Sequence, residues 1–185
     1  MKNIASAVLL LIFASAFIPA AHAQFGRDPL NSKEIGALRE TRQAPNDRLK
    51  LYAKYAKARV DTVEHLLSDP RFAADRGPQV HDLLQDIGRI VDEMDDNVDM
   101  YAGDKYDIRK PLKDIIQSDT EFQLKLRQIK ENANSNPAAA EELRKNYQFV
   151  LDDTLDSVNS SLNNARKTLD EQEALAKQKQ LRKAE

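Results

Sequence analysis

Apolar residues recur along most of this chain at alternating steps of three and four positions, which places them on one stripe of an α-helix. The first long stripe comprises Leu49, Ala53, Ala56, Val60, Val63 and Leu67. We expect its helix to begin at Asn46, because an asparagine side chain accepts hydrogen bonds from the free amides of a first turn. Asp69-Pro70 favours an end near Ser68, and we expect one further helical turn from Pro70 to Arg76, before Gly77.

Two more helices are expected after Gly77-Pro78, because glycine suits the end of one helix and proline the first turn of the next. The second helix ends at Gly103, and its stripe comprises Val80, Leu83, Leu84, Ile87, Ile90, Val91, Met94, Val98 and Tyr101. The third begins near Asp107 and contains two rows with a seven-residue repeat. These rows are Ile108, Ile115, Phe122 and Ile129, and Leu112, Asp119, Leu126 and Ala133.

A fourth helix is expected to follow the turn at residues 134–137 and to continue for about 40 residues. Its apolar row comprises Leu143, Tyr147, Leu151, Leu155, Val158, Leu162, Ala165 and Leu169. Beyond this row the chain has only scattered apolar residues among Lys177, Lys179, Arg182 and Lys183. The other helices are shorter, so the last turns of this one should project beyond them.

The pattern predicts an all-α protein, because it contains no alternation of apolar and polar residues typical of a strand. Short loops between amphipathic helices favour an antiparallel four-helix bundle, which we assign to residues 46–170. Residues 171–185 form a projecting charged helical tail. Residues 24–45 form an N-terminal arm with a short helix, in which Asn31 caps the first turn and Glu34 reaches back to it.

Residues 1–23 have the three parts of a cleavable signal peptide. Lys2 supplies the positive charge, residues 4–18 supply the apolar run, and Ala21 and Ala23 are small enough for a signal peptidase, so we place cleavage after Ala23. An uncleaved anchor is the alternative, but an apolar run of about 15 residues is shorter than the roughly 20 that a spanning helix needs. We therefore expect an exported protein, periplasmic or secreted, with no stable membrane insertion after cleavage.

Composition narrows the chemistry of the exported chain. It contains no cysteine, which excludes disulfides, thiol catalysis, cysteine-ligated metals and a lipid anchor on cysteine. The formal net charge is -2, and removing residues 1–23 removes one lysine and no acid, so it becomes -3. Such a balance argues against nucleic acid as a partner.

Asp61, His65 and His81 are weak candidates for a metal site. Asp61 and His65 are four residues apart, so they share a helix face and could together bind a metal ion. The Glu-x-x-His pairs of dimetal bundles are absent, and the alternative is that both histidines are ordinary surface residues. The acidic run at residues 92–99 offers oxygen ligands but lacks a calcium-loop pattern, which favours a solvated helix face.

Asp119 is the fourth candidate, because it occupies a row otherwise filled by apolar residues. A buried lone carboxylate is costly, so it needs a partner or a raised pKa. One interpretation is a site or a water-filled pocket inside the bundle. Another is a polar layer that fixes helix register, with Asn159, Asn163 or a lysine or arginine as partner. Partial exposure of the side chain is a third, and a local cap at residues 118–121 that breaks the helix is a fourth.

No motif of nucleophilic catalysis, phosphate binding or dinucleotide binding is present, so we expect neither an enzyme nor a cofactor. The favoured hypothesis is a non-enzymatic structural or interaction protein of the cell envelope, adaptor or chaperone-like. Its protein partners, or a second copy in self-association, would contact the C-terminal helix. The alternative is a helical bundle that binds a metal or a small ligand.

Overall fold

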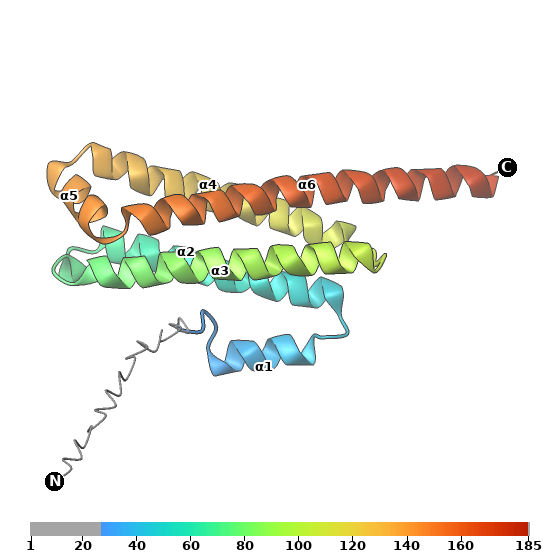
Figure 1. Ribbon diagram of the computed structural model, residues 1–185, viewed down its shortest axis with the longest axis horizontal. Helices are drawn as coiled ribbons and strands as arrows, with labels where there is room; N and C mark the ends of the chain where they lie inside the picture. Colours follow the sequence, from blue (N-terminus) through green and yellow to red (C-terminus); the bar gives the residue numbers. More distant parts are fainter. Residues whose placement is uncertain (1–26, 185) are drawn as a thin grey trace, which may run out of the picture.

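The computed structural model describes residues 27–184, and every regular element within them is a helix (Figure 1). The chain is therefore all-α, as its apolar pattern predicts. In chain order the elements are α1 (Ser32–Glu40), α2 (Pro45–Ser68), the 3₁₀ turn η1 (Pro70–Phe72), α3 (Arg76–Gly103), α4 (Arg109–Asn134), α5 (Pro137–Asn146) and α6 (Gln148–Ala184). The expected signal peptide and its cleavage site lie outside the described residues.

Four long helices, α2, α3, α4 and α6, form the body of the molecule. α2 packs against α3 and α4, and α6 packs against the same two helices. Each of the four runs opposite to the one before it (Figure 1). The largest fully buried side chains lie between them and are Tyr52, Phe122, Leu49, Leu84, Ile87, Ile90, Met94, Ile108, Leu112, Ile115, Leu126 and Leu151. The apolar stripes thus face one common core.

The short helix α1 begins as its sequence predicts. The side chain of Asn31 accepts hydrogen bonds from the amides of Lys33 and Glu34, and the Glu34 carboxylate accepts one from the amide of Asn31. Glu34 also accepts two hydrogen bonds from the Arg59 guanidinium of α2, which lowers the pKa of Glu34. This pair, with the buried Leu38, attaches α1 to α2.

Two predicted helix starts are wrong. α2 begins at Pro45, one residue before Asn46. The cap position is occupied by Ala44, so no side chain caps the first turn. The fixed φ of proline suits this first turn, so no polar cap is needed. α3 begins at Arg76, so Gly77 and Pro78 lie inside its first turn and do not separate two helices.

The predicted single fourth helix is in fact two helices, α5 and α6, and the break falls at Tyr147. Tyr147 has φ -146° and ψ 12°, outside the α-helical region. Its side chain is nevertheless buried, so the apolar row continues across the break and conceals it in the sequence. α5 turns across the end of the long helices (Figure 1), where Gly77 admits the side chain of Asn146.

The last turns of α6 continue well past the ends of α2, α3 and α4 (Figure 1). Leu175 and Leu181 in this part are 54% and 60% exposed. We name residues 174–184 the α6 extension. No helix within residues 27–184 combines the length and apolar character needed to cross a bilayer.

Candidate functional site

The residues considered for metal binding do not come together. Asp61 is exposed on α2, and its carboxylate accepts hydrogen bonds from one lysine of α2 and one of α4. His65 packs edge to face on Phe72 with ring centroids 5.6 Å apart. His81 Nδ1 on α3 lies 3.4 Å from Asp82 Oδ1. Among the described residues no three histidine or acidic side chains are grouped closely enough to hold a metal ion.

Asp119 is fully buried on an unbroken α4, so both partial exposure and a local cap at residues 118–121 are wrong. Its Oδ2 accepts a 2.8 Å hydrogen bond from the Ser161 hydroxyl of α6, and its Oδ1 has no partner among the described residues. Among the described residues neither Asn159 nor Asn163 nor a basic side chain hydrogen-bonds to Asp119, and Asn159 accepts from Gln123 instead. Burial raises the pKa of Asp119 to about 7.

A second carboxylate, Asp95 of α3, belongs to the same polar layer. It is close enough to Asp119 to raise the pKa of that residue further, and burial raises the pKa of Asp95 itself. Asn164 of α6 donates hydrogen bonds of 2.8 Å to both Asp95 and Asp99. Carboxyls that resist ionisation and small polar side chains thus join α3, α4 and α6 at one level, which suits a layer that fixes helix register.

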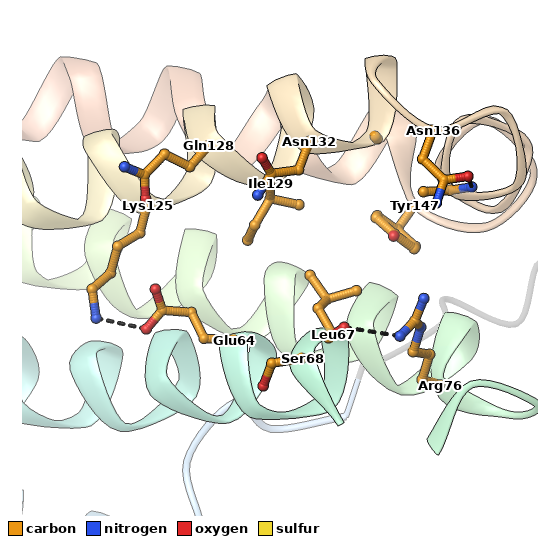
Figure 2. Close-up of a pocket in the computed structure, with 12 residues that line it drawn as sticks. Glu64, Leu67, Ser68, Arg76, Lys125, Gln128, Ile129, Asn132, Asn136 and Tyr147 are labelled. Atoms are coloured by element: carbon orange, nitrogen blue, oxygen red, sulfur yellow. Dashed lines mark hydrogen bonds and ion pairs between the residues drawn. The ribbon is translucent and has the colours of Figure 1, made fainter. Parts of the chain in front are cut away.

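Figure 2 shows a pocket of about 430 Å³ at the α5 end of the molecule, between α2, α4 and α5. Its two cations, Lys125 and Arg76, already form ion pairs with carboxylates. Glu64, the partner of Lys125, also lines the pocket, and the other polar lining is neutral and includes the amides of Gln128 and Asn132 and the hydroxyl of Tyr147. Neutral donors and acceptors around an apolar floor suit a small uncharged polar molecule better than an ion.

At the other end, the loop between α3 and α4 meets α6. Gln172 joins them, because its Nε2 donates to the carbonyl of Tyr106 at 2.9 Å and its Oε1 accepts from the amide of Ile108 at 3.1 Å. Tyr106 and Leu175 line a groove of about 610 Å³ beside this anchor. Beyond Glu173 most side chains of α6 are exposed. Exposed apolar groups therefore gather where α6 leaves the body.

The fold and these features define a class: an all-α protein with a buried polar layer, a small pocket at one end and a projecting helix at the other. Comparison with protein-family models, curated proteins and solved structures finds no match for this chain. Its function is therefore inferred from its own geometry.

Sequence reasoning missed two residues of these features, Ser161 and Gln172. Ser161 carries a usable signal, because Thr154, Ser161 and Thr168 recur every seven residues on α6 and all three are buried. The same spacing that identified Asp119 on α4 would identify this inner row. Gln172 carries no such signal, since its partners are backbone groups of a loop whose position depends on the packing of α3 and α4.

Proposed function

We propose that this chain is a non-enzymatic interaction protein of the cell envelope, adaptor or chaperone-like, that engages a protein partner through the α6 extension. The observation that carries the proposal is that α6 continues past the body with Leu175 and Leu181 exposed. Helices gain most of their stability from packing on neighbours. Apart from Leu175, Ala176 and Lys179, which line the groove beside the α3–α4 loop, the projecting segment is exposed, so a partner that covers it explains its length.

Crosslinking in cells tests this proposal. The full chain is compared with a chain that ends at Glu173, which keeps the Gln172 anchor and removes the α6 extension. We expect the truncated chain to lose the partner crosslinks. A Leu175→Ala/Leu181→Ala variant should lose most of them too, because both exposed leucines lie on the extension.

The matched control is Phe149→Ala, since Phe149 is 82% exposed near the start of α6, far from the extension. Its crosslinks should equal those of the unchanged chain. If the chain ending at Glu173 captures the same partners in the same amounts, the extension is not the contact and the proposal is wrong.

The pocket in Figure 2 supports a second candidate function, binding of a small uncharged polar ligand. A ligand that binds only the folded chain raises its melting temperature. We expect a shift with at least one member of a panel of monosaccharides and small amides, and loss of that shift in an Asn132→Ala variant. Zn, Cu, Fe and Ca ions in the same assay test the metal alternative. Melting temperatures that none of these compounds changes would contradict both.

A further inference from the structure

The α6 extension presents a basic surface with apolar residues beside it. Its rows continue those that face the core, because Leu175 and Arg182 follow the buried Thr168 at seven-residue steps. Lys179 lies one turn from each of them and shares their face. Between residues 174 and 184 there are four basic residues and no acidic one. Leu175 and Lys179 line the groove beside the α3–α4 loop of the same chain, and from Lys179 onward this face of the helix is basic.

α3 carries the opposite surface near the same end of the molecule. Asp92, Asp96 and Asp99 are exposed and follow at steps of four and three, so they form one stripe, which we name the α3 acidic stripe. Residues 92–104 contain six acidic residues and no basic one, and Arg39, Arg42 and Arg48 line the pocket beside Asp96. None of these three aspartates forms an ion pair within residues 27–184. Met100 and Tyr106, 49% and 47% exposed, add apolar surface at this end.

We infer that the α6 extension of one copy of this chain docks on the α3 acidic stripe of a second copy. The inference rests on the proposed function and names its partner. The two surfaces are complementary in charge, and each has exposed apolar side chains beside its charges. At 1.5 Å per residue, the extension spans about 16 Å and residues 92–104 about 20 Å, so their lengths match.

The course of α6 favours contact between copies. A straight α6 points away from the end of its own α3 (Figure 1), so its extension cannot lie along the acidic stripe of the same chain. Two copies that meet end to end about a two-fold axis place each extension along the α3 of the other. Such an interface is isologous, which closes the assembly at two copies. Opposite charges on the two surfaces also make it sensitive to salt.

The inference is tested by measuring the mass in solution of the protein, expressed from the full chain and purified after any processing by the cell. We expect twice the chain mass at low salt and a shift toward one chain mass at about 0.5 M salt, where screening weakens exposed charge pairs.

Charge reversal on either surface should also separate the copies. The variants Lys179→Glu/Arg182→Glu and Asp92→Lys/Asp96→Lys should each give one chain mass. Combining all four substitutions makes the charges opposite again, with exchanged signs, and should restore the double mass. Lys50→Glu/Lys54→Glu, an exposed pair on α2, is the matched control and should keep it.

A single chain mass at every salt concentration would overturn the second-copy inference. So would a double mass in both charge-reversed variants, or failure of the combined variant to dimerise while its circular dichroism is native. If the chain is monomeric and its extension binds vesicles of anionic lipid, the basic surface serves a membrane instead. The proposed function fails separately, when truncation after Glu173 leaves the cellular crosslinks unchanged. A monomer that keeps extension-dependent crosslinks to another protein contradicts only the second copy.

Discussion

Asp119 lies between Leu112 and Leu126 in a seven-residue row of α4, and its carboxyl is removed from water with them. A charged carboxylate in these surroundings loses its hydration, and no basic side chain among the described residues pairs with it. Burial therefore raises the pKa of Asp119 to about 7, against about 3.9 for an aspartate in an unfolded chain. The folded protein holds a proton that the unfolded chain releases in this range.

Because the folded pKa of Asp119 is the higher one, its contribution to stability is present at low pH and is lost as the pH rises through about 7. Asp119→Asn keeps an acceptor for Ser161 and cannot ionise. We expect the free energy of unfolding of this variant, minus that of the unchanged chain, to be about 2.5 kcal/mol larger at pH 8 than at pH 5. Urea unfolding at the two pH values measures the difference.

The control for this experiment is Asp156→Asn, an exposed aspartate on α6. Its difference from the unchanged chain should be the same at both pH values. A pH-independent difference for Asp119→Asn would show that the buried carboxyl is ionised in the folded protein across the whole range.

Lys105 has φ 65°, and within residues 27–184 no other non-glycine residue has a positive φ. This left-handed conformation ends the turn after α3, and it costs a residue with a Cβ on the order of 1 kcal/mol. Lys105→Gly should therefore raise the free energy of unfolding by about 0.5–1 kcal/mol. Lys105→Ala keeps the Cβ and should leave stability nearly unchanged. Urea denaturation of both variants measures these changes. Equal stability of the Lys105→Gly and Lys105→Ala variants would show that the conformation of Lys105 is not strained.

At the scale of elements, the break between α5 and α6 depends on a contact with α3. Gly77 lies in the first turn of α3, and a Cβ built there would be 2.7 Å from both Cγ and Nδ2 of Asn146. The missing side chain of Gly77 lets the end of α5 approach α3. Arg76 adds two hydrogen bonds to Glu142 of α5. Contacts with Arg76 and Gly77 of α3 thus fix the orientation of α5.

Gly77→Ala should lower the free energy of unfolding by about 1–2 kcal/mol, because the added methyl overlaps Asn146. Asn146→Ala in the same chain removes the overlap and should restore most of the loss. Gly36→Ala is the control, since nothing lies within 4 Å of a Cβ there and helix propensity alone should raise stability slightly. Chemical denaturation of the three variants tests this. If Asn146→Ala fails to rescue Gly77→Ala, the overlap is not the cause.

At the scale of the whole molecule, the body and the α6 extension make unequal contributions to stability. The buried residues of α6 extend to Thr168, and Leu169 packs partly buried against the core, whereas the extension is largely exposed. A chain that ends at Glu173 should therefore melt within about 2 °C of the full chain at low protein concentration. A chain that ends at Leu155 loses Val158, Leu162 and Ala165 from the core and should not fold cooperatively. Thermal unfolding followed by circular dichroism measures both, and a large drop on removing the extension alone would show that it packs on its own chain.

Much of the fold was predictable because its signals are local. The helical class, the inward faces of α2, α3 and α4 and the capping box of α1 all follow from residues a few positions apart, and the same spacing singles out Asp119 without deciding whether it is buried. The start of α2 was misplaced because Pro45 begins the helix where an asparagine cap was expected, and the start of α3 because Gly77 and Pro78 lie inside its first turn. The break at Tyr147 was invisible because a buried tyrosine keeps the apolar row intact.

The sequence by itself determined that this chain is all-α and which side of each long helix is buried, because periodicity and capping act within one or two turns. Only the tertiary structure decided that Ser161 meets Asp119, that Asp61, His65 and His81 form no common site, and that the exposed apolar residues gather where α6 leaves the body. Those outcomes depend on which distant segments come together. Which segments come together depends on packing in the shared core, and no pattern within a single helix specifies it.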